Sequence, residues 1–272
     1  MQNKSFRIVF IGDICGRYGR RFLGKALPHI RLKFSPNLVI ANGENSAGGL
    51  GITRKTAYEI LECGVDVITG GNHIWDKKES SELLKDEPRI IRPMNYPPNV
   101  PGNGFYVFKT EDHIEVMIIN IQGRVFMEPV VDNPFVIMEN FLSQVKQKIV
   151  FIDFHAEATA EKQAMGFFLD GRVSAILGTH THVQTADLRI LQNGTAYQTD
   201  VGMTGSLDSV IGMEYDAVIR KFLTGINHKF EVGKENIILD MSIIDIDKST
   251  GKAINVQPLR IYESTYYTQL DF

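Results

Sequence analysis

The sequence predicts an α/β fold made of two facing mixed β-sheets that are flanked by helices. In the first third of the chain, short apolar runs alternate with helical stretches, which is typical of βαβ units and a largely parallel sheet. The second half repeats this alternation, and after residue 185 the pattern changes to short runs separated by hairpin-turn signals. We therefore expect parallel and antiparallel strands in one molecule, organised as a single domain over residues 1–272.

The elements of the first third are expected in the order strand, helix, strand, helix, strand, over residues 6–11, 20–33, 38–41, 54–63 and 65–69. The second helix is punctuated at both ends, because Thr53 is a good N-cap and Gly64 is a good residue to follow a helix. Five prolines lie between residues 85 and 101 and break regular structure. We expect this stretch to be a long surface loop beside the functional site.

The second half is expected to hold strands at 105–110, 115–121, 149–154 and 173–177, with a helix near 134–147 and residues 159–170 between the last two strands. The pair Asn193-Gly194 predicts a two-residue hairpin turn between runs at 188–191 and 195–199. Antiparallel strands are expected again at 236–246 and 253–261. No repeat of 20 to 50 residues occurs, so solenoids and propellers are not expected.

The composition is that of an ordinary globular protein. A net charge of −3 and a charged content of 22% give no electrostatic footprint for a polynucleotide or an anionic membrane, so neither partner is expected. The first residues lack the features of a signal peptide, and no apolar window approaches the length of a transmembrane helix. Only two cysteines occur, Cys15 and Cys63, which argues against a disulfide framework. We expect a cytoplasmic protein.

Metal-competent side chains stand at the ends of five predicted strands, beside glycines at positions 12, 43, 70, 71 and 178. The carboxyl ends of strands in an open α/β sheet form a common ligand edge, and glycine allows the backbone to approach a ligand closely. A single Asp or Asn after a strand is usually a turn residue, and a single buried His is usually only hydrogen-bonded. Seven such residues together predict a metal site. The candidates are Asp13, Glu44, Asn45, Asn72, His155, His180 and His182.

The candidate ligands combine carboxylates, amide oxygens and imidazoles, without thiolates. This mixture suits Fe, Mn or Zn and differs from a structural zinc site. Seven ligands are too many for one catalytic ion that keeps an open position, and about right for two ions bridged by one carboxylate. We expect two divalent or trivalent transition-metal ions per chain, with Fe or Mn favoured over Zn.

The order of these motifs resembles the calcineurin-like metallophosphoesterase superfamily, whose pattern runs D-x-H, G-D, G-N-H, a single His and G-H-x-H. Gly71-Asn72-His73 and the segment from Gly178 to His182 match this pattern. Cys15 stands in place of the first motif's His, and Asn42-Gly43-Glu44-Asn45 replaces the usual Gly-Asp. Both departures, with G-D-I-C-G-R at the start and G-M-T-G further on, resemble the YmdB-type branch over nearly the whole chain.

The resemblance implies a four-layer sandwich fold with Glu44 as the carboxylate that bridges the two ions. It also implies which side chains share each ion: Asp13, Asn45 and His182 on one, and Asn72, His155 and His180 on the other.

Other residues receive expectations of their own. The resemblance implies that His73 donates a proton to the leaving group, and the alternative is a purely structural hydrogen bond beside the metal shell. Cys15 is expected to be a small buried residue, because Asn45 takes the ligand position that the missing His leaves. Arg124 follows a strand end and Thr204 lies in a glycine-supported loop, so both are candidates for contact with substrate.

The implied function is hydrolysis of a small-molecule phosphodiester, a 2′,3′- or 3′,5′-cyclic nucleotide, by attack of a metal-bridged hydroxide. One alternative is a phosphomonoesterase or nucleotidase, since the same two-metal core serves both reactions. Another is a metal-binding regulatory protein with incidental phosphodiesterase activity. A homo-oligomer is compatible with the sequence.

Overall fold

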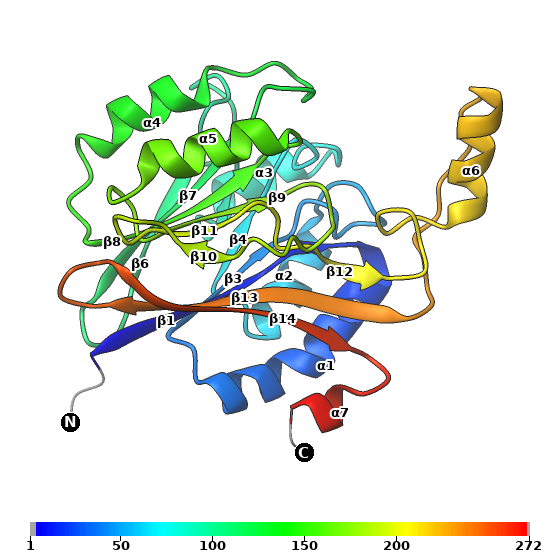
Figure 1. Cartoon of the computed structure of the whole chain (residues 1–272). Helices are drawn as coiled ribbons and strands as arrows, with labels where there is room; N and C mark the ends of the chain where they lie inside the picture. Colours follow the sequence, from blue (N-terminus) through cyan, green and yellow to red (C-terminus); the bar gives the residue numbers. More distant parts are fainter. Residues whose placement is uncertain (1–3, 271–272) are drawn as a thin grey trace.

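In the computed structural model, which describes residues 4–270, two β-sheets pack face to face and helices cover their outer faces (Figure 1). This is the predicted α/β architecture, and the fold class is confirmed. No helix within residues 4–270 is long and apolar enough to cross a membrane.

The first sheet consists of β1 (Ser5–Ile11), β2 (Asp13–Ile14), β3 (Leu38–Asn42), β4 (Val67–Thr69), β5 (Ile90–Ile91), β12 (Met203–Ser206), β13 (Ile237–Asp247) and β14 (Ala253–Tyr262). Its strand order is β2-β12-β13-β1-β3-β4-β5, and β14 pairs with β13. The run from β1 to β5 is parallel, whereas β13 is antiparallel to β1, β12 and β14. The sheet is therefore mixed, as predicted.

The second sheet consists of β6 (Phe105–Lys109), β7 (Glu115–Gln122), β8 (Ile149–His155), β9 (Ala175–Thr179), β10 (Arg189–Ile190) and β11 (Ala196–Gln198). Its strand order is β10-β11-β9-β8-β7-β6. The four central strands are parallel and the two edge strands are antiparallel to their neighbours. The antiparallel β10–β11 pair forms a hairpin around Asn193-Gly194 as predicted, but its turn is longer than two residues, because the N–H of Leu191 donates to the backbone oxygen of Thr195 at 2.8 Å.

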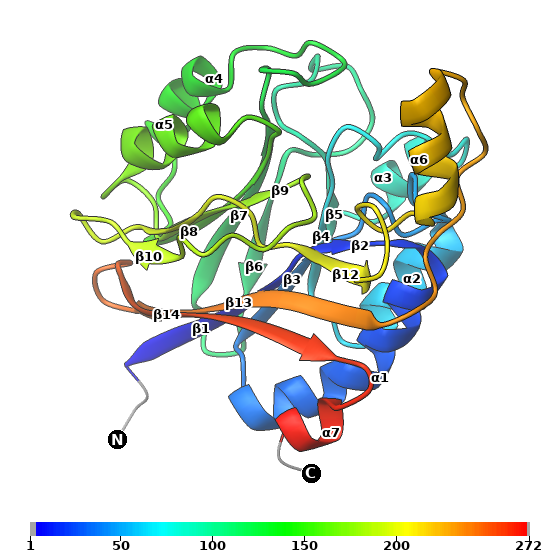
Figure 2. The same ribbon diagram turned by 45° about the vertical axis from the view of Figure 1, so that its right-hand side comes forward.

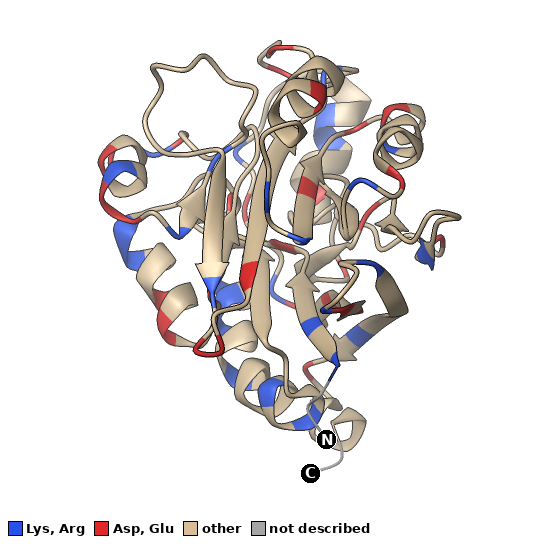
Figure 3. Cartoon of the chain, turned by 90° about the vertical axis from the view of Figure 1, so that its left-hand side faces the viewer, with Lys and Arg blue, Asp and Glu red and all other residues tan. Residues whose placement is uncertain are grey.

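The helices are α1 (Gly16–Phe34), α2 (Arg54–Glu62), α3 (Ser80–Asp86), α4 (Pro134–Leu142), α5 (Thr159–Leu169), α6 (Tyr215–Thr224) and α7 (Tyr266–Gln269). Apolar residues of α1, α2 and α7 pack on the first sheet, and those of α4 and α5 pack on the second. Helix α6 stands at the edge of the molecule, away from both sheets (Figure 2). Acidic and basic residues are interspersed over the side seen in Figure 3.

The core between the two sheets joins apolar side chains from both of them. The rings of Phe10 on β1 and Phe151 on β8 meet edge to face, with their centroids 4.9 Å apart. In such a sandwich the central strands are covered on one face by the other sheet and on the other face by helices. Residues on both faces are therefore apolar, which explains the continuous apolar runs in the sequence. This packing fixes the carboxyl ends of β1 and β8 relative to each other.

Several sequence expectations differ from the structure. Residues 85–101 are not one long loop, because α3 extends to Asp86 and the buried pair Ile90–Ile91 joins the first sheet beside β4. Thr204 does not lie in a loop either, since Met203–Ser206 forms β12 between β2 and β13.

The predicted cap of α2 is confirmed: the side chain of Thr53 accepts a hydrogen bond from the backbone N–H of Thr56 at 3.2 Å.

Candidate metal centre

Five strand ends carry the seven candidate ligands, three from the first sheet and two from the second. Asp13 follows β1, Glu44 and Asn45 follow β3, and Asn72 follows β4. The second sheet contributes His155 at the end of β8 and the loop after β9 that contains His180 and His182. Because β1, β3 and β4 are parallel neighbours, as are β8 and β9, each set of ends lies on one edge of its sheet.

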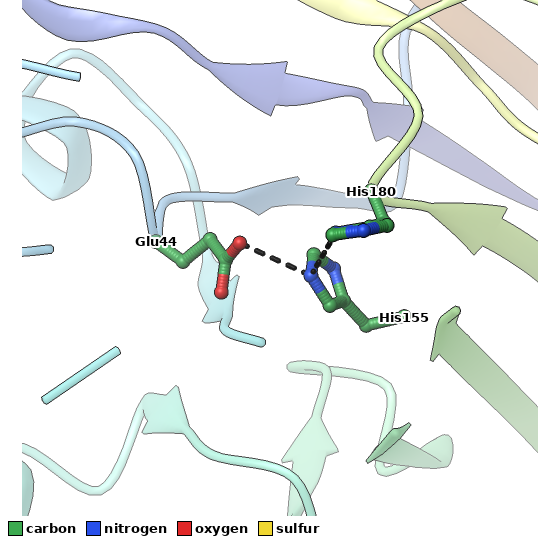
Figure 4. A group of neighbouring side chains, drawn as sticks. All are labelled: Glu44, His155 and His180. Carbon is green, nitrogen blue, oxygen red and sulfur yellow. Dashed lines mark hydrogen bonds and ion pairs between the residues drawn. The ribbon is translucent and has the colours of Figure 1, made fainter. Parts of the chain in front are cut away.

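His155 lies at the centre of the first group of side chains (Figure 4). Its Nε2 atom is 2.9 Å from Asn72 Oδ1, 3.1 Å from Glu44 Oε1 and 3.1 Å from His180 Nδ1. Ligand atoms of Glu44, His155 and His180 all lie within 4.8 Å of one another. These atoms come from four separate segments of the chain, and their lone pairs converge on one small volume.

The ring of His155 is held from behind by a buried hydrogen-bond chain. Its Nδ1–H donates to Thr179 Oγ1 at 2.9 Å, and the Thr179 hydroxyl donates to Asp153 Oδ1 at 2.6 Å. Burial raises the pKa of Asp153 to about 7. This chain fixes the tautomer of His155 so that Nε2 presents its lone pair to the site, a common arrangement around metal-binding histidines.

Asp13, Asn45 and His182 form the second group. Nε2 of His182 is 3.6 Å from Asp13 Oδ1 and 3.2 Å from Asn45 Nδ2. On the other side of the ring, Nδ1–H donates to the backbone oxygen of Ile211 at 2.8 Å, so Nε2 is the ring nitrogen that faces Asp13 and Asn45. The two groups are adjacent, because Oδ2 of Asp13 accepts from the backbone N–H of His180 at 3.2 Å.

The carboxylate of Glu44 is fully buried and touches both groups. Its Oε1 atom lies 3.1 Å from Nε2 of His155 and 3.3 Å from Nδ2 of Asn45. Its Oε2 atom accepts the backbone N–H of His73 at 2.9 Å. One carboxylate thus contacts the central histidine of the first group and an amide of the second.

The residues present fit a bound cation. Asp13 Oδ1 and Asn45 Oδ1 are buried and have no hydrogen-bond partner. Buried oxygen atoms without a donor are rare and call for an explanation, such as an ion. A mixture of carboxylate, amide and imidazole ligands suits first-row transition metals. The second group therefore provides oxygen lone pairs that suit a cation.

The electrostatics of the site favour positive charge. Burial alone raises the pKa of Asp13, but the charge of His182, followed by the charge of His155, outweighs it and lowers that pKa below its usual range. Burial lowers the pKa of His155, but the charge of Glu44 outweighs it and raises that pKa. Burial, followed by the charge of His155, lowers the pKa of His180 to about 3. An ionised Asp13 and a neutral His180 are the forms that bind metals, whereas the raised pKa values of His155 and His182 mean that a bound cation would displace a proton from each of these two rings.

Gly71 shows why glycine stands beside the ligands. A Cβ atom at this position would overlap Oε2 of Glu44 and Nε2 of His155. Any larger residue would push these side chains apart. The backbone at Gly71 therefore forms one wall of the site, in agreement with the expectation that glycine permits a close approach.

His73 lies at the rim of this centre, next to Asn72. Its side chain is 32% exposed, and its Nδ1–H donates to Asp76 Oδ2 at 2.8 Å. The imidazole is thus partly exposed to solvent, while the backbone N–H of the same residue donates to Glu44. This position suits a group that exchanges protons with a bound molecule.

Cys15 is fully buried, as predicted. Its Sγ atom lies 3.5 Å from Nδ1 of His182, the nitrogen that donates to Ile211, and not beside Nε2. The thiol therefore contacts the side of the ring that faces away from Asp13. Cys15 and Cys63 are both free thiols.

The two candidates for substrate contact differ in accessibility. Arg124 is exposed in the loop after β7, and Gly123, which precedes it, donates its N–H to the backbone oxygen of His155 at 2.9 Å. The carboxylate of Glu161 accepts the backbone N–H of Arg124 at 2.9 Å and so fixes this loop. Thr204 is fully buried within β12. Of the two, Arg124 is the one in a position to meet a molecule from solvent.

Asp153 and Thr179 support the site but were not among the candidates. Asp153 precedes His155 by two positions, so on a strand both side chains point to the same face of the sheet. Thr179 sits inside the Gly178-to-His182 motif. The sequence does contain a signal for Asp153, because it is a polar residue two positions before His155 on an otherwise apolar strand.

A family model described as YmdB-like protein matches residues 9–259. The chain belongs to the YmdB-like family. A relative from Bacillus subtilis (strain 168), named 2′,3′-cyclic-nucleotide 2′-phosphodiesterase, is 44% identical over 257 residues, which cover 94% of this chain and 97% of that protein. A Mycoplasma genitalium protein that carries the name putative phosphatase/phosphodiesterase is 36% identical over 263 residues, covering 94% and 93% of the two chains.

Solved structures show the same fold. A hypothetical protein from Thermus thermophilus is similar with a TM-score of 0.90 and 41% identity, over 95% of this chain and all 100% of that one. A Mycoplasma pneumoniae phosphatase is similar with a TM-score of 0.92 and 35% identity, over 99% and 100% of the two chains. The predicted YmdB-type branch is confirmed, and so is the predicted enzyme class, a hydrolase of phosphoric diesters. The YmdB-like family also implies divalent metal ions.

Proposed function

We propose that this member of the YmdB-like family is a dinuclear-metal phosphodiesterase that hydrolyses 2′,3′-cyclic nucleotides, and 3′,5′-cyclic nucleotides as a second substrate class. The observation that carries the proposal is the position of Glu44, whose carboxylate contacts His155 of one group and Asn45 of the other. The name of the Bacillus subtilis relative supports the choice of a cyclic nucleotide.

In this proposal Glu44 bridges two ions, Fe or Mn rather than Zn. Asp13, Asn45 and His182 hold one ion, and Asn72, His155 and His180 hold the other. The orphaned oxygens of Asp13 and Asn45 support the first ion, and the lone pairs gathered around His155 Nε2 support the second. When bound, two such ions supply an acidified water nucleophile and offset the charge that develops on the phosphoryl oxygens.

His73 is the proposed proton donor to the departing ribose oxygen. Its Nδ1–H is held by Asp76, so its Nε2 is the atom that meets the leaving group. The hydrogen bond to Asp76 orients the ring, and the imidazolium is the form that has a proton to give at Nε2. Loss of the proton to the alkoxide then leaves a neutral imidazole hydrogen-bonded to Asp76.

Arg124 is the proposed contact for the substrate phosphate. A guanidinium binds phosphate oxygens through paired hydrogen bonds, and the Glu161 carboxylate anchors the Arg124 backbone beside the end of β8. Thr204 is not carried into this proposal, because its side chain is inaccessible in β12.

A phosphomonoesterase is the second candidate, favoured by one observation: the Mycoplasma genitalium relative bears both names, phosphatase and phosphodiesterase. We also propose that residues 1–272 form one domain, since ligands from both sheets complete a single centre. A cytoplasmic location and a homo-oligomer stay predictions.

The test is a comparison of kcat/KM for the Mn²⁺-loaded protein on 2′,3′-cyclic AMP, 3′,5′-cyclic AMP, bis(p-nitrophenyl) phosphate and p-nitrophenyl phosphate. We expect 2′,3′-cyclic AMP to exceed p-nitrophenyl phosphate by roughly tenfold or more, equivalent to ~1.4 kcal/mol of transition-state stabilisation. Arg124→Ala should raise KM for the cyclic nucleotide. A preference for the monoester over both cyclic nucleotides would replace the proposal with the phosphomonoesterase.

A further inference from the structure

Lys162 and Asp200 form a buried ion pair between helix α5 and the ends of β9 and β11. Lys162 on α5 is 1% exposed and Asp200, which follows β11, is 0% exposed. Lys162 Nζ lies 2.8 Å from Asp200 Oδ2. Lys and Asp are almost never fully buried unless they are paired. Neither residue belongs to a motif that the sequence predicts, and neither is a candidate ligand.

Lys162 and Asp200 form hydrogen bonds with the peptide groups on both sides of His180. Lys162 Nζ donates to the backbone oxygen of Thr179 at 2.8 Å. Oδ2 of Asp200 accepts the backbone N–H of Thr181 at 3.0 Å. One buried charge thus holds the residue before His180, and the opposite charge holds the residue after it.

The loop that carries these histidines has an unfavourable backbone conformation. His180 has a φ of 103° and His182 has a φ of 63°, both in the positive region that non-glycine residues rarely adopt. Such conformations persist only when the surrounding structure enforces them. The hydrogen bonds from Lys162 and to Asp200 act directly on the peptide groups that flank His180.

Gly178 makes room for this arrangement. At Gly178, a Cβ atom would lie 3.2 Å from Lys162 Nζ and would overlap the backbone oxygen of Thr199. Oδ1 of Asp200 accepts the N–H of Gly202 at 2.9 Å, so the second carboxylate oxygen is also occupied. Both charged groups therefore have hydrogen-bond partners in the buried space that they occupy.

We propose that Lys162 and Asp200 are positioning residues of the metal centre, which hold the 179–182 loop so that the imidazoles of His180 and His182 face the two ion positions. The inference rests on the proposed metal-binding function. A buried ion pair adds little net stability compared with apolar residues of the same volume. Its value here lies in the two backbone contacts that apolar residues cannot make.

The competing explanation is a general contribution to the stability of the fold, and a second, more exposed ion pair far from the ligands separates the two. Arg7 and Asp245 form a bidentate ion pair, with bonds of 2.7 and 2.9 Å, between β1 and β13. Arg7 lies near the start of β1, whereas the candidate ligand Asp13 follows its end. Loss of this control pair should affect stability without affecting metal affinity.

The experiment measures Mn²⁺ affinity by titration calorimetry for the full chain, with circular dichroism to establish folding. The variants are Lys162→Met, the double variant Lys162→Met/Asp200→Asn, which leaves no unpaired buried charge, and the control Arg7→Met/Asp245→Asn. Loss of a group that orients metal ligands typically weakens metal affinity about 10- to 100-fold. We expect that loss in both Lys162 variants and unchanged affinity in the control.

The outcomes separate the inference from the proposed function. If the wild-type protein bound no Mn²⁺, the proposed metal centre itself would fail. If the wild type bound Mn²⁺ and the folded double variant bound it equally well, the positioning role alone would be wrong. If both Lys162 variants failed to fold while the control folded, the pair would be a requirement of the fold, and the inference would be overturned.

Discussion

His73 and Asp76 are joined by a hydrogen bond of 2.8 Å from Nδ1–H to Oδ2, within the turn that follows β4. The backbone N–H of the same histidine donates to Glu44 at 2.9 Å. One residue thus connects the buried carboxylate of the metal centre with an exposed His–Asp pair. The main chain of His73 holds Glu44, while its side chain is partly exposed to solvent.

His73→Ala should retain metal and lose turnover. The substitution removes the imidazole but keeps the backbone N–H that holds Glu44, so the metal content should equal that of the wild type. General acid catalysis typically contributes about 10²- to 10⁴-fold, and we expect kcat on 2′,3′-cyclic AMP to fall within that range. Elemental analysis and steady-state rates check both parts. A fully active variant would show that another group protonates the ribose oxygen.

Asp76→Asn should slow the hydrolysis of substrates with poor leaving groups more than that of substrates with good ones. Asparagine can still accept the Nδ1–H of His73, but it removes the negative charge that lies beside the ring. We expect kcat to fall by roughly tenfold on a cyclic nucleotide, whose alkoxide needs a proton, and to change little on bis(p-nitrophenyl) phosphate, whose phenolate does not. Glu79→Gln, an exposed acid in the same region, is the matched control. Equal losses on both substrates would point to a structural role for Asp76.

The clustering of the seven candidate residues could be predicted from the sequence, because these polar residues lie at or just after the carboxyl ends of apolar strands. The supporting residues could not. In the sequence, Lys162 looks like a solvent-facing helix residue. Its burial follows from its ion pair with Asp200, which is distant in the sequence. The sequence predicts a loop at Thr204 and not a strand, because β12 is defined by its pairing with β13, a strand that lies far along the chain. Long-range pairing of this kind leaves no local signal.

Gly71→Ala tests the backbone wall of the metal centre. The added methyl group would overlap Glu44 and His155, which are fixed by their own hydrogen bonds. We expect a folded protein whose Mn²⁺ affinity falls by about tenfold or more, the scale seen when ligand orientation is disturbed. Gly24→Ala on α1 is the control, since its nearest neighbour would be Cys63 Cβ at 4.0 Å. Normal affinity in Gly71→Ala would mean that the ligands can shift without cost.

Asp245→Asn should destabilise the protein in a pH-dependent way. Burial opposes ionisation of Asp245, but the hydrogen bonds of Arg7 and Asn255 outweigh it and lower the pKa. Because the folded pKa lies below the unfolded value of about 3.9, the stabilisation is fully present above that pH and disappears as the pH falls through the folded pKa.

Urea unfolding of wild type and Asp245→Asn checks this expectation. We expect a difference in the free energy of unfolding of about 1 kcal/mol at pH 7, the upper end for partly exposed ion pairs. The difference should shrink as the pH falls below about 4. A difference that stayed constant down to about pH 2, below the unfolded pKa, would indicate that the side-chain amide changes packing rather than charge.

The number of metal ions per chain tests the central claim most directly. Mn²⁺ is titrated into metal-free wild-type protein and into Glu44→Gln, with bound metal and the hydrolysis rate of 2′,3′-cyclic AMP followed together. We predict two ions per wild-type chain, activity that saturates only with the second ion, and loss of both metal and activity in Glu44→Gln, because the amide lacks the charge that a bridging ligand shares between two cations. Full activity with fewer than two ions per chain, or an active Glu44→Gln protein with its full metal content, would contradict the dinuclear account.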